Sequence, residues 1–409
     1  MDAPYDLTVA INDIRMSKAL ALARHFHRAG YRVIGITSPR YRHTPAHCSR
    51  AFERIHVLPD ARREPDAYLS ALERILSTEN VDWFVPICAP ATEQLDARAK
   101  DRLEEKGICR VFHFDEAITR RLGDKFAFAQ WAAYLGLPVP DTRLVTGLEQ
   151  VMAFQTPPNK PYLLKRIRYD PAGRTRPLLL PLPTVEAVRD AVSGLDISPE
   201  TPWVLQELIE GNEYCAHATI SNGRIRLYTD SRSSAAQLNY EHVGDERMRG
   251  WVERFVSGAD LREGQLCFDF MESPDGKMVA IECNPRVHSA ITAFYNHPKV
   301  TDAYFDPRGT ADCIEPLDSA LPTYWLHQDL ERLARALISA LRGGGIEAVR
   351  SRLRTIRQGT DVMLNPDDPW PFACVNLHFA SSLIDKIVRG GEWSRLEYCI
   401  GKIVEPGGD

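Results

Sequence analysis

Residues 269–291 hold two carboxylates whose spacing could bind a metal ion. The stretch reads DFMESPDGKMVAIECNPRVHSAI, and two extended runs flank the turn signal PDG at 274–276, which predicts a β-hairpin. Because side chains alternate between the faces of a strand, Glu282 and Asn284 share one face, and the turn brings Asp269 roughly opposite Glu282. Two facing carboxylates repel each other. A magnesium ion would turn that repulsion into coordination, since it favours one or two carboxylates plus substrate phosphates.

Two lysines occupy positions that favour an anion nearby. Lys125 lies in the first turn of a helix predicted over 123–140, where the helix dipole disfavours a cation unless a group such as phosphate is also held there. Lys165 lies within the apolar strand pattern YLLKRIR (162–168), where an inward lysine costs desolvation unless it meets an anion. The alternatives are a solvated surface lysine at Lys125 and a side chain that reaches solvent at Lys165. With the polar segment QELIEGNEY (206–214), these groups together predict a site for a nucleoside triphosphate and Mg²⁺.

The elements that must position these groups begin with an α/β part. Strands and helices alternate to about residue 115, which predicts a parallel sheet covered on both faces. No G-x-G-x-x-G motif follows the first strand, so a dinucleotide site is not expected. In the helix expected over 17–30, the apolar residues Leu20, Leu22 and Phe26 are interpreted mainly as a face that packs in the core. The expected strands are 7–12, 31–37, 81–87 and 109–114, and the other expected helices are 67–78 and 91–106.

The middle of the chain is rich in strands and the end is rich in helices. The strand patterns predict a largely antiparallel α+β region, and the helices predict an extension that packs on the core or on a second subunit, with Leu333, Leu337 and Leu341 as an apolar seam. The expected strands are 162–168, 203–209, 213–220, 224–230, 265–272 and 278–284, and the expected helices are 327–344, 345–359 and 379–391.

Composition limits the class of protein. The 409 residues suggest two or three domains, and the net charge of −5 gives no reason to expect nucleic acid or an anionic membrane as a partner. The nine cysteines contain no C-x-x-C pair, which fits a reducing compartment rather than a disulfide framework or a zinc site. No signal peptide or membrane span is apparent, so a cytoplasmic location is expected. Small molecules are the expected partners, and a homodimer is left open.

The order of these groups resembles the ATP-grasp superfamily over about residues 1–310, most specifically in IECNPR (281–286) and CFDF (267–270). The resemblance implies an ATP-grasp fold, an α/β and α+β architecture with a C-terminal helical extension, and ATP and Mg²⁺ as cofactors with Mn²⁺ as a substitute. The implied parts are an N-terminal α/β domain at 1–115, linker helices and a central lid domain at 116–205, an ATP-binding domain at 206–310 and the extension at 311–409.

The same resemblance implies a role for each site residue. Lys125 and Lys165 would contact the phosphates, and Arg286 would face the γ-phosphate and a phosphorylated intermediate. The adenine hinge would be Glu207, Leu208 and Ile209, the ribose contact Glu213, and the metal ligands Asp269, Glu282 and Asn284.

The chain departs from the superfamily in two places. The lid loop, usually glycine-rich so that backbone N–H groups can hold phosphate, reads RYDPAGRTRPLLLP (168–181), where Arg174 or Arg176 would replace those donors. After NPR the chain continues VHSAITAFYNHP (287–298) instead of small glycines. The second departure, with LLKRIRYDP and the tail CIGKIVEPGGD (399–409), resembles mycosporine-glycine synthases. That family implies phosphorylation of the enolate oxygen of 4-deoxygadusol and displacement of phosphate by glycine.

Three further side chains are candidates for contact with the acceptor substrate. His288 and Ser289 follow Arg286 directly, and His288 is considered both as a catalytic group and as hydrogen-bonded structure. Arg232 lies in a polar stretch (230–242) and could hold the carboxylate of an amino acid; the alternative is an ordinary loop. Cys267 and Cys283 are expected to face the core and to be inert.

Three functional hypotheses stay open. The first is an ADP-forming C–N ligase acting on a cyclohexenone such as 4-deoxygadusol. The second is a carboxylate–amine ligase that forms an amide or dipeptide through an acyl phosphate. The third is a non-catalytic nucleotide-binding protein, which the complete set of lysine, glutamate and asparagine residues argues against.

Overall fold

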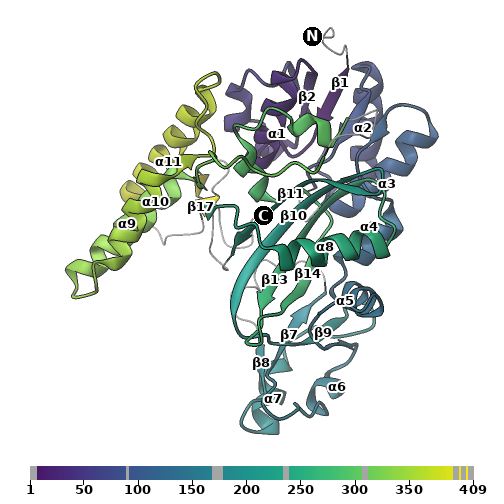
Figure 1. Ribbon diagram of the computed structural model, residues 1–409, viewed down its shortest axis with the longest axis vertical. Helices are drawn as coiled ribbons and strands as arrows, with labels where there is room; N and C mark the ends of the chain where they lie inside the picture. Colours follow the sequence, from purple (N-terminus) through teal and green to yellow (C-terminus); the bar gives the residue numbers. More distant parts are fainter. Residues whose placement is uncertain are drawn as a thin grey trace.

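The computed structural model describes residues 7–88, 92–167, 178–233, 239–305, 312–389, 396–397 and 402–403. Figure 1 shows an N-terminal α/β domain at the top, a larger sheet at the centre, a smaller domain at the bottom and a helical arm to one side. The smaller domain occupies the part of the chain expected to be the lid and keeps that name below. The lid loop at 168–177, with Arg174 and Arg176, lies outside the described residues, as does nearly all of the tail at 399–409.

The N-terminal domain is a five-stranded parallel sheet in the order β3-β2-β1-β4-β5. Helix α1 packs on one face through Leu20, Leu22 and Phe26, and α2 and α3 pack on the other, so the predicted architecture is confirmed. Strand β3, which is short and half exposed, was not expected. The elements are β1 (Thr8–Ile11), α1 (Ser17–Arg28), β2 (Arg32–Thr37), β3 (Arg54–Val57), α2 (Pro65–Thr78), β4 (Trp83–Val85), α3 (Glu93–Glu105) and β5 (Arg110–Val111).

The central sheet has the antiparallel order β11-β10-β13-β14. One face is apolar: Phe268 and Phe270 of β13 pack against Trp251 and Phe255 of α8 and Phe128 of α5. The other face carries the candidate site. The elements are α4 (Glu116–Gly123), α5 (Lys125–Tyr134), β10 (Asn212–Ser221), β11 (Arg224–Arg232), α8 (Glu246–Gly258), β13 (Gly264–Glu272) and β14 (Met278–Asn284).

The lid domain is a second four-stranded sheet, in the order β6-β9-β7-β8. Its strand β9 ends at Glu207, two residues beyond the boundary expected at 205, and residues 208–211 then connect it to β10 of the central sheet. The elements are β6 (Thr142–Val145), α6 (Leu148–Met152), β7 (Tyr162–Arg166), β8 (Leu178–Leu180), α7 (Val185–Val192) and β9 (Trp203–Glu207).

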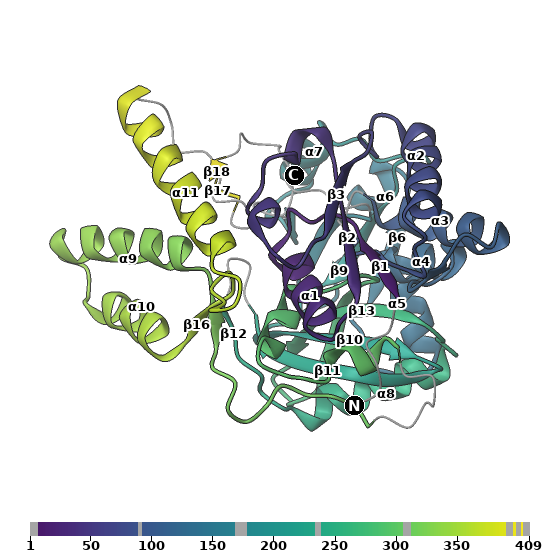
Figure 2. The ribbon, with the colours of Figure 1, turned by 90° about the horizontal axis from the view of Figure 1, so that it is seen from above.

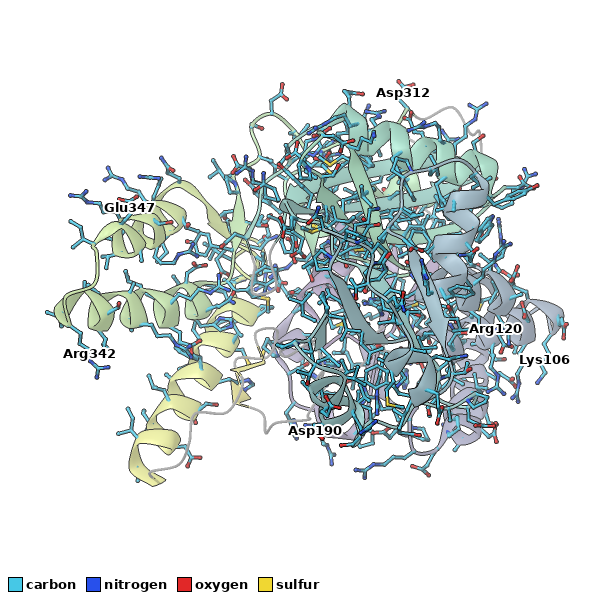
Figure 3. The ribbon with its side chains drawn as sticks, turned by 90° about the horizontal axis from the view of Figure 1, so that it is seen from below. Lys106, Arg120, Asp190, Asp312, Arg342 and Glu347 are labelled. Atoms are coloured by element: carbon cyan, nitrogen blue, oxygen red, sulfur yellow. The ribbon has the colours of Figure 1, made fainter. Side chains whose placement is uncertain are left out.

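The C-terminal extension is joined to the central domain by a small sheet in the order β12-β15-β16 (Figure 2). Beyond that sheet α9 and α10 project from the body, and Arg342 and Glu347 mark the far end of the arm in Figure 3. Helix α11 begins against the N-terminal domain, where Phe372 and Val375 pack with its core. The predicted seam is not packed on the core, because Leu341 is 88% exposed and Leu337 is 47% exposed. The elements are β12 (Asn239–Tyr240), β15 (Thr323–Tyr324), α9 (Leu326–Leu341), α10 (Glu347–Gln358), β16 (Thr360–Asp361), α11 (Trp370–Arg389), β17 (Leu396–Glu397) and β18 (Lys402–Ile403).

None of the helices in the described ranges is long and apolar enough to cross a membrane.

Two glycines of the central domain should respond in opposite directions to an added methyl group. Gly211, just before β10, has a φ of +151°, and a Cβ there would lie 1.7 Å from the backbone oxygen of Glu272. Gly211→Ala should therefore lower the free energy of unfolding by about 2 kcal/mol or more. Gly250, inside α8, has open space around it. Gly250→Ala should raise stability by about 0.5–1 kcal/mol. Urea midpoints measure both, and equal effects would contradict this backbone account.

Candidate functional site

The predicted hairpin forms, and it brings the two carboxylates together. Asp269 of β13 lies directly opposite Glu282 of β14, and Asn284 lies on the same face, opposite Cys267. The amide of Asn284 is 3.4 Å from the Glu282 carboxylate. These oxygen donors fit a magnesium ion that completes its shell with phosphate and water, because the protein supplies only part of the coordination. Among the described residues no group of three His, Cys, Asp or Glu side chains has metal-binding geometry, so a closed zinc-type site is not present there.

Both predicted lysines point toward the carboxylate pair. The Nζ of Lys125 lies 3.4 Å from the Glu282 carboxylate, and that of Lys165 donates a hydrogen bond of 2.8 Å to Gln206. Burial lowers the pKa of Lys165, while the charges of Glu282 and Asp269 oppose that shift. The lysines come from the start of α5 and from β7 of the lid, so two separate elements neutralise one acidic face. The same two cations are placed to receive the phosphates of a nucleotide.

Gln206, which no sequence argument singled out as a ligand or support, connects the lid to the central sheet. It reaches the face that carries Asp269, Glu282 and Asn284, which is called the metal face below. A β-bulge in β14 leaves Ile281 as an extra residue between the pairs Asp269–Glu282 and Phe270–Ala280. The Ile281 carbonyl accepts a hydrogen bond of 3.0 Å from the Gln206 amide, whose oxygen accepts from Lys165. The signal in the sequence was a glutamine within the buried strand WVLQE.

The predicted adenine hinge lies where the lid joins the central sheet. Leu208 and Ile209 are half-buried in the connection between β9 and β10. The Glu207 carboxylate pairs with Lys160 at 2.9 Å and accepts from the backbone N–H of Asp141. At the start of β10, the Glu213 carboxylate accepts a hydrogen bond of 3.4 Å from the Ser233 hydroxyl. This placement is compatible with the expected contacts to adenine and ribose.

Arg286 contacts a residue of the N-terminal domain that the sequence did not reveal. Its guanidinium donates to the Glu93 carboxylate at 2.8 Å, and both side chains are largely buried. Burial tends to lower the pKa of Arg286, but Glu93, Cys267 and Glu282 together outweigh burial and raise it, so the guanidinium stays charged. Glu93 also lies against Gly123, where a Cβ would come within 2.8 Å of its carboxylate. The ion pair fixes the position of Arg286 beside the metal face.

Lys18 was also missed, because its helix was interpreted as mainly a core face. Its side chain is buried, and its Nζ donates a hydrogen bond of 2.5 Å to the carbonyl oxygen of Val287, next to Arg286. Burial lowers the pKa of Lys18 to about 8, with the charge of Arg286 contributing. A lysine in the apolar pattern SKALALA was the available signal.

His288 and Ser289 lie against Tyr240 rather than standing free. The Nδ1 of His288 accepts a hydrogen bond of 3.2 Å from the backbone N–H of Ala290, and its ring meets that of Tyr240 edge-on at 5.3 Å. Burial holds the pKa of His288 well below its usual value, so the ring is neutral. The Ser289 hydroxyl is hydrogen-bonded to that of Tyr240. His288 thereby caps a 3-10 helix (Ser289–Phe294), and its contact with the acceptor stays a prediction.

The strand register sets the sheet face on which Arg232, Cys267 and Cys283 lie. Arg232 pairs with Tyr214, which pairs with Phe270, so its Cα position shares the apolar face and the structure does not bring it together with the metal ligands. Cys283 belongs to the apolar core as expected. Cys267 lies two residues from Asp269 and shares the metal face, so the expected face was wrong for this residue. Its side chain is nevertheless buried, and burial raises the pKa of its thiol, as expected of an inert cysteine.

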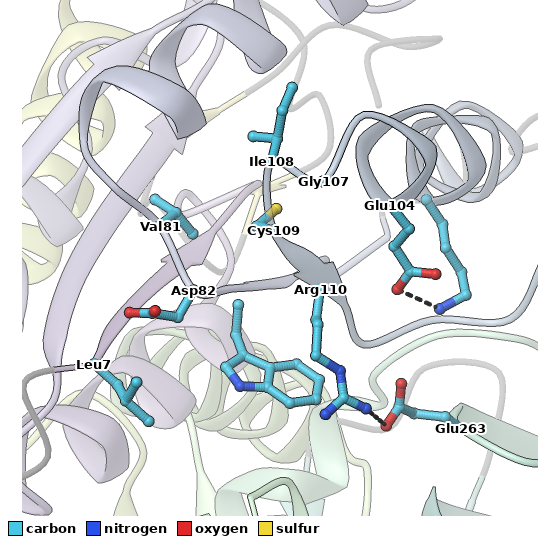
Figure 4. Close-up of a pocket in the computed structure, with 11 residues that line it drawn as sticks. Leu7, Val81, Asp82, Glu104, Gly107, Ile108, Cys109, Arg110 and Glu263 are labelled. Carbon is cyan, nitrogen blue, oxygen red and sulfur yellow. Dashed lines mark hydrogen bonds and ion pairs between the residues drawn. The ribbon is translucent and has the colours of Figure 1, made fainter.

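A cavity of about 620 Å³ lies elsewhere, at the opposite end of the N-terminal sheet (Figure 4). Asp82 precedes β4 and Arg110 begins β5, whereas Lys18 follows the carboxyl end of β1. The guanidinium of Arg110 lies 4.0 Å from the ring centre of Trp83 and 3.5 Å from Glu263. These charges satisfy one another, so the cavity offers no obvious binding chemistry.

No protein-family model matches the chain, and a sequence comparison with curated proteins finds no match either. Solved structures do match. An L-amino acid ligase from Bacillus licheniformis is 14% identical, covering 71% of this chain and 69% of that one, with a TM-score of 0.53. The ADP complex of purK, an N5-carboxyaminoimidazole ribonucleotide synthetase, is 15% identical over 82% and 85% of the two chains, with a TM-score of 0.59. A carboxyaminoimidazole ribonucleotide synthase from Aspergillus clavatus, complexed with ATP, is 13% identical over 78% and 80%, with a TM-score of 0.55. At these identities the likeness shows the fold, which is the predicted ATP-grasp fold.

Replacing Glu282 tests the metal face. Glu282→Gln removes one anionic ligand but keeps the shape of the side chain, so calorimetry should show at least a ~10-fold loss in the affinity for ATP with Mg²⁺. The melting temperature should change little, because the hairpin pairing is unaffected. Glu272→Gln, an acid-to-amide change at the rim of the same hairpin, is the control and should bind ATP and Mg²⁺ as the wild type does. An unchanged Mg²⁺ dependence in Glu282→Gln would rule out the proposed ligand set.

Proposed function

We propose that the chain is an ATP- and Mg²⁺-dependent ligase that forms a C–N bond and releases ADP and phosphate. The observation that carries the proposal is the facing pair Asp269 and Glu282, neutralised by Lys125 and Lys165 from two other elements, with Arg286 close by. A purely structural sheet face gains nothing from opposed carboxylates and buried cations. The arrangement is suited to holding a triphosphate and a divalent ion while charge moves between phosphoryl oxygens.

The reaction would proceed in two steps. An oxygen of the acceptor attacks the γ-phosphorus of ATP, the bond to the β–γ bridging oxygen breaks, and ADP leaves. The amine then attacks the carbon that bears the new phosphate, loses a proton, and expels inorganic phosphate. Asp269, Glu282 and Asn284 would hold the magnesium ion, which would neutralise phosphate charge when bound. Lys125 and Lys165 would exchange their present contacts for phosphate oxygens, and Arg286 would stabilise the phosphoryl group in transfer.

For the acceptor we propose the enolate of a cyclohexenone, 4-deoxygadusol, and for the amine an amino acid such as glycine, giving mycosporine-glycine. The support is the sequence resemblance in LLKRIRYDP, ECNPRVHSAIT and the C-terminal tail. The second candidate is a carboxylate–amine ligase that acts through an acyl phosphate. The similarity in fold to an L-amino acid ligase favours it. Both reactions would use the same nucleotide site and differ only in the acceptor.

Product analysis distinguishes the candidates. The purified protein would be incubated with ATP, Mg²⁺ and glycine, with either 4-deoxygadusol or a set of simple amino acids as the acceptor, and the products would be analysed by mass spectrometry. We expect mycosporine-glycine with stoichiometric ADP. Dipeptides with ADP would support the second candidate, and AMP with pyrophosphate would contradict both. ATP binding without turnover of any acceptor would support a non-catalytic protein.

Arg286 should matter more for turnover than for nucleotide binding. Arg286→Ala removes a contact made mainly in the transition state, so kcat should fall about 100-fold or more while the Kd for ATP changes only a few-fold. The change also leaves the buried Glu93 carboxylate unpaired, which lowers stability. In the double variant Arg286→Ala, Glu93→Gln, stability should recover while kcat does not. Recovery of kcat together with stability would show that Arg286 acts only in folding.

A further inference from the structure

Four buried polar atoms near the site have no hydrogen-bond partner within the described part of the chain. They are the indole Nε1 of Trp325, both polar atoms of the Gln328 carboxamide, and the Ser231 hydroxyl. The three side chains are between 0% and 1% exposed. Leaving a buried polar group unsatisfied costs about 1–3 kcal/mol, and native proteins avoid it unless the group serves another purpose. Several such atoms together therefore call for a partner that binds there.

Trp325 connects this group to the segment that follows Arg286. Its ring lies 6.0 Å from that of Tyr240, and Tyr240 in turn meets His288 at 5.3 Å. The Tyr240 hydroxyl is hydrogen-bonded to Ser289, and burial raises its pKa well above the usual value, with the charge of Asp269 adding to the rise. The ring of Tyr240 thus lies between Trp325 and the residues that follow Arg286, and it also lies close to Asp269 on the metal face.

Ser231 lies on the metal face itself. It pairs with Cys215 of β10, which pairs with Asp269 of β13, so the three side chains lie in one row across the sheet. Cys215 packs in the same small cluster as Tyr240, Ala290 and Trp325. The unsatisfied hydroxyl of Ser231 therefore belongs to the same region as the indole N–H of Trp325.

Gln328 is held on the same side by the anchor of the extension. Trp325 is the N-cap residue of α9, and its carbonyl oxygen accepts hydrogen bonds of 3.0 Å from the backbone N–H groups of Gln328 and Asp329, so the three residues meet at the start of this helix. There, the Asp329 carboxylate accepts a hydrogen bond of 3.2 Å from Asn239 and one of 3.1 Å from Arg352. Thr323 of β15 also donates from its hydroxyl to the carbonyl oxygen of Tyr240. The extension is thereby fixed against β12, where Figure 2 shows it joining the body.

We propose that the start of α9 forms part of the acceptor site, in which Trp325, Gln328 and Ser231 bind hydroxyl or carbonyl groups of an uncharged, oxygen-rich part of the acceptor. An indole N–H, a carboxamide and a hydroxyl can donate to and accept from such groups, and none of them carries a charge. The reacting oxygen of the acceptor would face Arg286 and Lys18, which are cationic. The inference rests on the proposed function and deepens it, because it assigns the C-terminal extension to substrate selection.

The test compares two enolic acceptors, 4-deoxygadusol and cyclohexane-1,3-dione, of which the second lacks hydroxyl substituents. A site built to bind hydroxyl groups discriminates strongly against an analogue without them. The wild type should prefer 4-deoxygadusol by ~100-fold or more in kcat/KM, with glycine, ATP and Mg²⁺ present. In Gln328→Leu and Trp325→Phe the KM for 4-deoxygadusol should rise by ~10-fold or more. The KM for cyclohexane-1,3-dione, which lacks the hydroxyl groups, should rise much less, so the preference should shrink.

Stability without substrate provides an independent readout. Replacing an unsatisfied buried group by an apolar one of similar shape is nearly neutral or stabilising, so neither variant should melt below the wild type. Trp370→Phe is the matched control, because Trp370 is 58% exposed on α11, and it should leave KM unchanged. A structural or water-binding role would be shown by an unchanged KM in both variants, and that result would overturn the inference.

Binding can be separated from turnover. Titration of 4-deoxygadusol into the protein with ADP and Mg²⁺ should show binding to the wild type that weakens by ~10-fold or more in Gln328→Leu. If the wild type binds 4-deoxygadusol in this way but forms no product, the proposed reaction fails and the acceptor site stands. If the wild type turns the compound over and Gln328→Leu does so equally well, the reaction stands and the acceptor site fails.

Discussion

The repulsion between Asp269 and Glu282 is the constraint around which the site is organised. The register of the β13–β14 hairpin places the two carboxylates opposite each other, and no shift by one residue is possible without burying them in the apolar face beneath. Without nucleotide, Lys125 and Lys165 compensate the negative charge. Their charges are therefore already in place when a triphosphate and its metal ion arrive, which reduces the reorganisation that binding requires.

The segment that follows the metal ligands is where separate parts of the chain meet. The N-terminal domain reaches it through Glu93, which pairs with Arg286, and through Lys18, which donates to the Val287 carbonyl. The C-terminal extension reaches it through Trp325 and Tyr240. These contacts link parts of the chain that are distant in sequence. A shift of any of these parts would therefore change the position of Arg286 and Val287 beside the metal face. Packing of α1 against the 3-10 helix at 289–294 adds an apolar contribution to the same junction.

Local patterns predicted much of the fold and the metal face. The turn signal at 274–276 located the hairpin, and strand alternation put Glu282 and Asn284 on one face. The pairing of Asp269 with Glu282 also needs the bulge at Ile281, which the sequence did not reveal, because an unbroken register would set Asp269 opposite Ile281. Asp124 caps helix α5 with two backbone hydrogen bonds, which explains why Lys125 starts that helix. The parallel sheet followed from the alternation of strands and helices, but its strand order was not predicted. Strand β3 was missed because it is only four residues long and none of its residues is fully buried.

Contacts across domains could not be predicted in this way. Glu93 lies 193 positions from Arg286 and Lys18 lies 269 positions from Val287, and neither spacing carries a local signal. The arm was expected to bury its leucine seam, but periodicity shows only that one face is apolar and not what covers it. Arg232 was a candidate by residue type alone, and the strand register then placed it on the other face of the sheet.

The most direct test of the account is the position of a divalent ion relative to the hairpin. Crystals grown with ADP and Mn²⁺ would be measured at the manganese absorption edge, so that an anomalous difference map locates the metal. The account predicts a peak within coordination distance of Asp269, Glu282 and Asn284, with Lys125 moved from Glu282 to a phosphate oxygen. A nucleotide bound with its metal elsewhere, and with the Lys125–Glu282 ion pair intact, would contradict it.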